Sequence, residues 1–155
     1  MSTPATVALR AAGVSFTEHA YQHDPAVTDF GAEAASELGV EPDRVFKTLL
    51  VDVDGTLVVG IVPVTGKLDL KALATTLGGK RATMADAAVA ERKTGYLVGG
   101  ISPIGQKSAH PTVLDETAEL WDTVFVSGGR RGFDLELAPV DLIRATNATI
   151  ADIAR

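Results

Sequence analysis

Two long β-branched runs, separated by one tight turn, form the clearest pattern of the chain. They extend over 45–54 and 56–64, and Asp54-Gly55 at their junction is typical of a two-residue hairpin turn. The first run is apolar on both faces, which is typical of an inner strand rather than an edge strand. The pattern therefore predicts a β-hairpin inside a sheet.

Shorter helix and strand patterns alternate on both sides of this hairpin. Helical stripes bounded by capping residues, proline or glycine cover 4–12, 32–38, 69–77, 86–93 and 139–146. Strand patterns cover 14–21, 80–84, 96–98, 112–114, 123–127 and 133–137. Because helices and strands interleave, we expect an α/β (α+β) fold with a mixed sheet and flanking helices, in a single domain of residues 1–155.

The composition limits the kinds of site that the chain can build. The 155 residues are 46% hydrophobic and 22% charged, and none is cysteine. The chain therefore has no disulfide, no thiol nucleophile and no cysteine-ligated metal. Its longest apolar run, 58–64, is far shorter than the roughly 20 residues that span a bilayer. We expect a cytoplasmic protein with no membrane association.

A net charge of −6 disfavours phosphate binding over the whole surface of the protein. The charges are nevertheless uneven along the chain. Residues 1–43 contain seven acidic and one basic side chain, whereas residues 67–110 contain three acidic and seven basic ones. We therefore expect a local basic rim on an acidic body, whose binding to a nucleic acid weakens as salt is added.

Lys47 is the most informative charge, because it lies within the apolar run 45–51. A buried ammonium group is costly unless it is paired. Lys47 therefore either extends from the strand end into solvent or holds an anionic or carbonyl oxygen in a pocket. Strand alternation places Thr48 on the opposite face, so both residues serve one pocket only if the strand end is bent.

Two glycine pairs could bring backbone amides close to a ligand. Gly99-Gly100 precedes Ile101-Ser102-Pro103, and Gly128-Gly129 precedes Arg130-Arg131. Each segment is also typical of an ordinary turn with solvated side chains, so residue patterns alone leave both interpretations open.

Metal and triad chemistry have no support in the sequence. His19 and His23 are spaced like metal ligands, but a strand followed by a turn does not place them on one face, and no third ligand is fixed nearby. Ser102 and Ser127 lie outside any Gly-x-Ser-x-Gly motif. We expect no metal, no cofactor and no protein nucleophile.

Several segments taken together resemble the YbaK family, the free-standing homologues of the prolyl-tRNA synthetase editing domain. These segments are 21–25 (Tyr-x-His-Asp-Pro), 45–49 (Val-Phe-Lys-Thr-Leu), 68–71 (Leu-Asp-Leu-Lys), 94–107 and 126–134. The resemblance extends over essentially the whole chain. It implies a mixed α/β editing-domain fold and hydrolysis of mischarged aminoacyl-tRNA, chiefly Cys-tRNA(Pro).

The resemblance also implies roles for individual residues. Lys47 is similar to the family's essential pocket lysine, and the Gly99-Gly100 loop to the one whose amides face the ester and the terminal adenosine. The other pocket residues implied are Tyr21, Phe30, Thr48, Ile101, Ser102, Pro103, Ser127 and Asp134. The basic candidates for contact with the tRNA are Lys67, Lys71, Arg92, Lys93, Lys107, Arg130 and Arg131.

In the mechanism proposed for this family, the substrate's own cysteine thiol attacks its ester carbonyl and the tRNA hydroxyl leaves, so the enzyme supplies positioning and electrostatics. Ser108-Ala109-His110 stands where the family commonly has further basic residues, which weakens the expected contact with tRNA. We expect the tRNA acceptor end as a partner, together with prolyl-tRNA synthetase. The alternatives are a sister deacylase for Ala- or Ser-tRNA and a non-catalytic module that binds tRNA or a synthetase.

Overall fold

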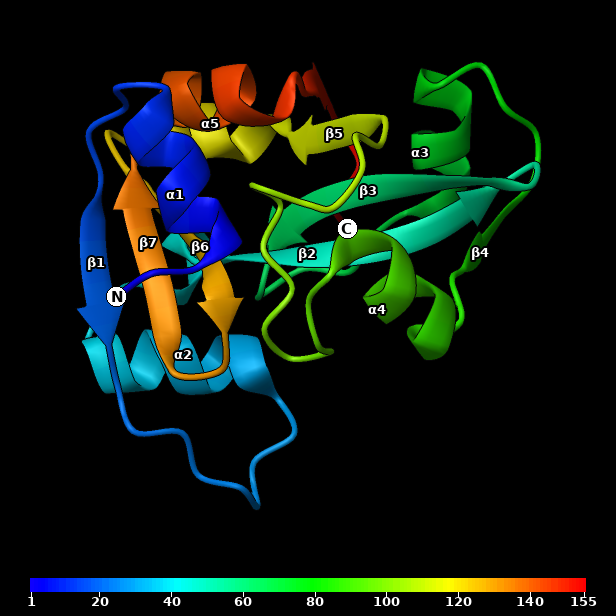
Figure 1. Cartoon of the computed structure of the whole chain (residues 1–155). Helices are drawn as coiled ribbons and strands as arrows, with labels where there is room; N and C mark the ends of the chain where they lie inside the picture. The colour runs from blue at the N-terminus through cyan, green and yellow to red at the C-terminus, as the bar shows by residue number, and fades with distance from the viewer.

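The computed structural model describes residues 1–155, in which five α-helices surround two β-sheets (Figure 1). The helices are α1 (Pro4–Ala11), α2 (Phe30–Leu38), α3 (Leu70–Thr76), α4 (Ala87–Thr94) and α5 (Pro139–Thr146). The strands are β1 (Thr17–Ala20), β2 (Phe46–Val53), β3 (Thr56–Pro63), β4 (Ala82–Met84), β5 (Thr112–Asp115), β6 (Val124–Arg130), β7 (Phe133–Leu137) and β8 (Thr149–Ala151). The short 3-10 helices η1 (Pro42–Arg44) and η2 (Glu116–Leu120) complete the fold.

The predicted hairpin is confirmed as β2 and β3, and it organises the larger sheet. Asp54 (φ 51°) and Gly55 (φ 87°) form the turn, which places Val53 opposite Thr56. The strand order is β4-β2-β3-β5-β8, with antiparallel pairing from β4 to β3 and parallel addition of β5 and β8. This is the mixed sheet expected from the sequence.

The second sheet, β1-β7-β6, is antiparallel and meets the first at one point. A parallel bridge joins Val45, immediately before β2, to Phe125 in β6. Farther along, β2 pairs instead with β4, and the last contact of that pair is a hydrogen bond from the Ala85 N–H to the Leu50 carbonyl. Residues 46–49 of β2 therefore lie where the two sheets diverge.

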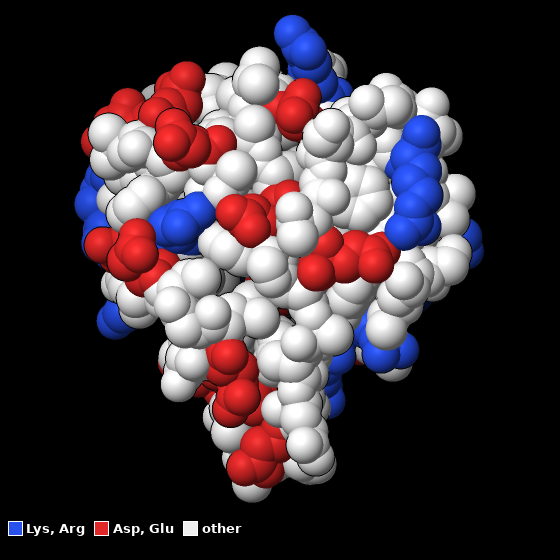
Figure 2. Space-filling view, turned by 90° about the vertical axis from the view of Figure 1, so that its left-hand side faces the viewer, with Lys and Arg blue, Asp and Glu red and all other residues white.

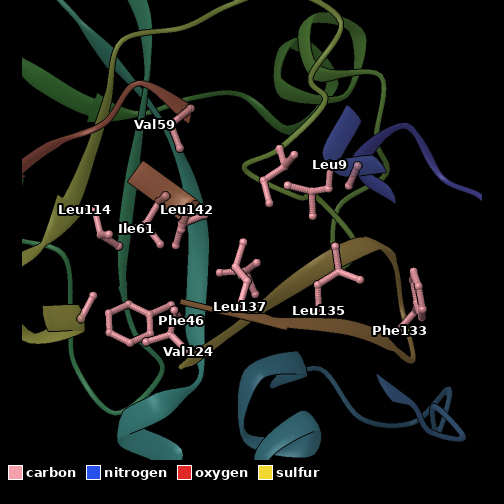
Figure 3. Close-up of a cluster of buried hydrophobic side chains, with 14 of the residues drawn as sticks. Leu9, Phe46, Val59, Ile61, Leu114, Val124, Phe133, Leu135, Leu137 and Leu142 are labelled. Atoms are coloured by element: carbon pink, nitrogen blue, oxygen red, sulfur yellow. The ribbon is translucent and has the colours of Figure 1, made fainter. Parts of the chain in front are cut away.

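A shared hydrophobic core fills the space between the sheets. Figure 3 shows side chains from both sheets, α1 and α5 packed together, each at most 2% exposed: Leu9, Phe46, Val59, Ile61, Leu114, Val124, Phe133, Leu135, Leu137 and Leu142. The other faces are covered separately. Helix α3 packs Leu73 against the far face of the larger sheet, and α2 packs Ala34 near Phe125 on the smaller one.

The strand predicted at 96–98 is wrong. Gly95 (φ 81°) ends α4, and the Tyr96 hydroxyl donates a hydrogen bond to the Ile104 carbonyl at 2.6 Å, so the segment folds back on itself as a loop. Leu97 is 73% exposed, and its carbonyl accepts the Gly100 N–H as in a turn. Of the three apolar residues in this segment only Tyr96 is buried, and none joins a sheet.

Two other strand predictions were incomplete. The strand predicted at 14–21 shortens to β1, and β8 was not predicted at all. Strand β8 exists because β5 offers it a parallel partner and because Asp115 anchors the chain that follows. The Oδ1 of this fully buried residue accepts the N–H groups of Ile153 and Ala154, both at 2.9 Å. None of the helices has the length and apolar character needed to span a bilayer.

Candidate functional site

A cavity of about 420 Å³ occupies the place where the two sheets diverge. Its walls come from the start of α2, residues 45–50 around the beginning of β2, the end of β4, α4, the loop after α4, and the facing strands β6 and β7. Thirteen of its 21 lining residues are hydrophobic, so the few polar groups in it stand in an apolar surrounding. Such a pocket is the usual form of a small-ligand site.

The strand register shows which backbone groups of β2 face this cavity. Residues opposite one another in an antiparallel pair alternate between hydrogen-bonded and non-bonded. Phe46 lies opposite Pro63, which has no N–H, so this pair is non-bonded and Thr48, two residues on, has the same phase. Leu50 follows Thr48 by two residues and so has the same orientation. Its carbonyl accepts a hydrogen bond from the Ala85 N–H, at the edge of β2 that faces away from β3. The N–H and C=O of Thr48 therefore point away from β3, toward the cavity edge.

Lys47 and Thr48 both line the cavity, although strand alternation directs them to opposite faces. Both reach it because the cavity surrounds the free edge of β2. The Lys47 ammonium makes no hydrogen bond or ion pair within the protein, and the buried Thr48 Oγ1 has no hydrogen-bond partner. A buried hydroxyl without a partner is costly, so a ligand that supplies one is favoured.

Asp134 and Tyr21 add a second polar group to the cavity wall. Asp134 is 6% exposed, and its carboxyl makes no hydrogen bond within the protein. Burial raises the pKa of Asp134 to about 7. Burial, and then the charge of Asp134, raise the pKa of Tyr21 to about 12. The phenol is therefore neutral, and Asp134 changes its charge near neutral pH.

Ser127 lies on β6 directly opposite Asp134 and also lines the cavity. Its Oγ accepts the Gly129 N–H at 3.2 Å, in the bulge before the hairpin tip. The hydroxyl hydrogen remains free for a ligand, but no histidine contacts it. Ser127 therefore offers a hydroxyl donor to the cavity.

The Gly99-Gly100 loop contributes unequally. Gly99 and Ile101 line the cavity, and neither N–H has an acceptor within the protein. The Gly100 N–H donates to the Leu97 carbonyl at 2.9 Å, and a Cβ on Gly100 would lie 2.5 Å from the Cα of Arg130. Gly100 therefore permits close packing of the loop on the β6–β7 hairpin, and the free amides are those of its neighbours.

Ser102 and Pro103 lie outside the cavity lining, as does Gly100. Ser102 is fully buried, and its Oγ accepts the Ile104 N–H at 3.2 Å, so this part of the loop stabilises its own turn. All the other residues expected in the pocket do line it: Tyr21, Phe30, Lys47, Thr48, Gly99, Ile101, Ser127 and Asp134.

The basic residues expected at the rim fall into separate groups. Arg92 and Lys93 end α4, and Lys107 lies beside them because its N–H bonds to the Thr94 carbonyl at 2.9 Å. Arg130 and Arg131 lie at the β6–β7 hairpin, against the Gly99-Gly100 loop. Lys67 and Lys71 flank the start of α3, on the face of the larger sheet away from the shared core.

Figure 2 shows the face of the molecule on the β1 side. Carboxylates are spread over this face and over the narrow projection formed by the chain between β1 and α2. Several Lys and Arg side chains also appear on this face and along its edge, so the view shows a mixed surface with carboxylates over the projection and near the middle.

The cavity wall that β4 and α4 contribute was not predicted from the sequence. Met84, Ala85, Ala87 and Ala90 line the cavity. Small and apolar residues at helical spacing are equally typical of an ordinary core contact, so no local signal identifies them as cavity residues.

Comparison with known proteins supports the fold and identifies the family. The family model of the aminoacyl-tRNA editing domain matches residues 24–145. The chain is 43% identical over 124 residues to EbsC of Enterococcus faecalis, a candidate Cys-tRNA(Pro)/Cys-tRNA(Cys) deacylase, with 79% of this chain and 76% of that protein covered. It is 32% identical over 100 residues to the proline–tRNA ligase of Maridesulfovibrio salexigens, which covers 64% of this chain and 17% of the ligase.

Solved structures agree with these sequence matches. The hypothetical protein APE2540 superposes with a TM-score of 0.88 at 28% identity, covering 99% of this chain and 100% of that one. A candidate trans-editing enzyme for prolyl-tRNA synthetase superposes with a TM-score of 0.84 at 26% identity, covering 100% and 99%. The chain belongs to the aminoacyl-tRNA editing domain family, as its YbaK-type motifs indicate.

Proposed function

We propose that this chain, as a single domain of residues 1–155, is a cytoplasmic trans-editing deacylase that cleaves the ester bond of mischarged aminoacyl-tRNA, with Cys-tRNA(Pro) as its main substrate. The observation that carries the proposal is the cavity at the free edge of β2, where an unpaired Lys47 and an unpartnered Thr48 hydroxyl stand in an apolar surrounding. The name of EbsC, the relative that is 43% identical, supports the choice of substrate.

Such an activity answers a physical limit on amino-acid selection. A synthetase pocket shaped for one small side chain rejects another of similar size by only about 1–3 kcal/mol. A second site that hydrolyses the wrong product removes the error. The largely apolar cavity of about 420 Å³ offers room for a small aminoacyl group next to the terminal ribose.

The chain carries no group suited to nucleophilic attack in the cavity. It has no cysteine, and its three histidines, His19, His23 and His110, bond to Glu136, Glu33 and Gln106 outside the cavity lining. Neither the Thr48 hydroxyl nor the Ser127 hydroxyl makes a hydrogen bond to a base. We therefore assign the nucleophile to the substrate.

In this mechanism the cysteine thiol of the substrate bonds to its own ester carbonyl carbon. The bond from that carbon to the ribose oxygen breaks, the thiol proton passes to the ribose oxygen, and water then hydrolyses the cyclic thioester. Lys47 and the free amides of Gly99 and Ile101 stabilise the negative charge that develops on the carbonyl oxygen. Thr48 orients the aminoacyl group, and the ionised Asp134 accepts its ammonium group.

The tRNA approaches from the side of the α4 end. Arg92, Lys93 and Lys107 form a small basic group there, Arg130 lies apart from it at the β6–β7 hairpin, and Lys67 and Lys71 lie on another face. So few phosphate contacts provide modest affinity, and we infer that prolyl-tRNA synthetase contributes to recognition of the tRNA.

A panel of charged tRNAs tests the substrate. We expect Cys-tRNA(Pro) to be deacylated, and Ser-tRNA(Pro), Ala-tRNA(Pro) and S-methylcysteinyl-tRNA(Pro) to be spared, because only the first carries a free thiol. Release of the amino acid is measured with and without prolyl-tRNA synthetase. Hydrolysis of the alanyl or seryl form with sparing of the cysteinyl form would establish the sister deacylase instead. Binding to the synthetase without any deacylation would establish a non-catalytic module.

Substitution of Lys47 tests its role in charge stabilisation. Lys47→Ala should lower kcat for Cys-tRNA(Pro) about 10²- to 10³-fold, as loss of an oxyanion donor does. Circular dichroism and the thermal midpoint should stay near the wild-type values, because the Lys47 ammonium makes no hydrogen bond or ion pair within the protein. Lys80→Ala is the matched control, because Lys80 is exposed, precedes β4 and lies outside the cavity lining. Full activity of Lys47→Ala would show that the role is wrong.

Thr48→Val separates binding from stability. The substitution keeps the shape and removes a buried hydroxyl without a partner, so the free energy of unfolding should stay constant or rise by about 1 kcal/mol. Deacylation should fall roughly 10-fold, because the substrate loses a hydrogen bond. Urea unfolding and single-turnover kinetics measure the two effects, with Thr83→Val on exposed β4 as control. Unchanged deacylation would exclude Thr48 from the substrate site.

Asp134 makes the stability of the free protein depend on pH. The pKa of Asp134 is about 7 in the folded state, against 3.8 as a free side chain. Protonated Asp134 therefore contributes its full share to the free energy of unfolding below pH 3.8, and this share is lost as pH rises through 7. Relative to Asp134→Asn, the wild-type free energy of unfolding should fall by up to about 4 kcal/mol between pH 4 and pH 8. Urea unfolding at both pH values measures this difference. Parallel pH profiles of the two proteins would contradict it, and the exposed Asp122→Asn is the control.

A further inference from the structure

Arg131 joins three segments of the chain at the cavity. It lies at the tip of the β6–β7 hairpin, and its Nε and Nη2 donate hydrogen bonds to the Val98 carbonyl at 3.1 and 2.7 Å. Its guanidinium carbon lies 4.6 Å from the centre of the Phe30 ring, at the first residue of α2. Val98 and Phe30 both line the cavity. One side chain therefore ties the loop after α4 to the start of α2.

The Phe30 ring of this contact also packs against a second side chain, His23. The ring of His23 lies 5.7 Å from that of Phe30, and its Nδ1 bonds to Glu33 Oε1 at 2.6 Å. Glu33 Oε2 accepts the N–H of Asp24 at 2.9 Å. The Phe30 ring thus contacts both a hydrogen-bonded imidazole and the guanidinium.

The neighbouring glycine fits the same arrangement. Gly99 has a φ of 90°, and a Cβ there would overlap the Arg131 Nε and lie 3.0 Å from the Phe30 ring. The loop can approach the guanidinium this closely only without a side chain at this position. Arg131 pairs with no carboxylate, so its charge is not used in an ion pair.

We propose that Arg131 is a positioning residue that fixes the width of the cavity entrance by clamping Val98 and Gly99 against Phe30. The proposal deepens the proposed function, on which it rests. It differs from the role expected from the sequence, in which Arg131 contacts a tRNA phosphate. The Nε and Nη2 donors of Arg131 both point at the Val98 carbonyl, and the flat face of the guanidinium lies against the Phe30 ring. Both features require a guanidinium and not merely a positive charge.

The two roles make opposite predictions for a substrate without phosphate. The cysteinyl ester of adenosine carries the reacting ester and the terminal nucleoside but no phosphate group. A phosphate contact has nothing to bind in this compound, whereas a clamped entrance acts on it as on the tRNA. Displacement of a substrate wall by about 1 Å is enough to cost on the order of 10²-fold in rate.

The experiment compares Arg131→Met and Arg131→Lys with the wild type on this ester and on Cys-tRNA(Pro). We expect kcat to fall about 10- to 100-fold in both variants on both substrates, with a small change in KM. This loss relative to the wild type should stay the same between about 50 and 200 mM salt. Lysine should not rescue, because it lacks the fork and the flat face. Arg144→Met, an exposed arginine on α5, is the control and should leave both rates unchanged.

A different pattern overturns the proposal. If Arg131→Met is fully active on the adenosine ester and weak on tRNA, with a loss that shrinks as salt rises and is repaired by lysine, Arg131 is a phosphate contact. A double-mutant cycle with Phe30→Leu gives a second criterion. The fold-loss in kcat of the double variant should be smaller than the product of the two single losses, because both substitutions remove the same contact. A loss equal to that product would exclude the clamp.

Hydrogen exchange distinguishes failure of this proposal from failure of the proposed function. If the wild type hydrolyses neither substrate, the deacylase assignment fails, but the clamp is still tested. The hydrogen-bonded amides of Val98 and Gly100 should exchange faster in Arg131→Met than in the wild type, while amides of β2 and β3 stay unchanged. Equal exchange at the loop in the two proteins would contradict the clamp.

Discussion

The change of partner along β2 is the constraint on which the rest of the structure depends. The strand begins beside β6, at the bridge from Val45 to Phe125, and ends beside β4. Between these two points the outer edge of β2 has no neighbour, because one strand cannot follow two sheets that diverge. The cavity, the free backbone groups of Thr48 and the unpaired Lys47 all arise from this gap. A continuous sheet would have closed the site with a ladder of hydrogen bonds.

The gap is held open by side chains that come from distant parts of the chain. Helix α2 covers the smaller sheet and places Phe30 at the cavity, while α4 brings Ala87 and Ala90 to it from the larger sheet. The β6–β7 hairpin supports the loop after α4 through the close approach of Gly100 to Arg130. The site therefore has rigid walls on several elements, which suits a reaction in which positioning and electrostatics provide the catalysis.

Two polar groups of the cavity have no hydrogen-bond partner within the protein, which favours a ligand that supplies one. The Thr48 hydroxyl has no partner, and the Asp134 carboxyl is buried without a hydrogen bond. Each of these features lowers the stability of the free protein. A substrate that carries an ammonium group and an ester can satisfy both, so part of its binding free energy comes from groups that the fold itself leaves unpaired.

Local sequence determined the hairpin at Asp54-Gly55, most helices and the family, because turns, caps and motifs act over a few residues. It also marked Lys47 as a candidate site residue, because a cation within an apolar strand can be recognised in the sequence. Only the tertiary structure decided that 96–98 is a loop, that β8 exists, and that Arg131 bonds to Val98, 33 residues away. Such contacts join segments distant in the chain, and their energies depend on packing that no local pattern contains.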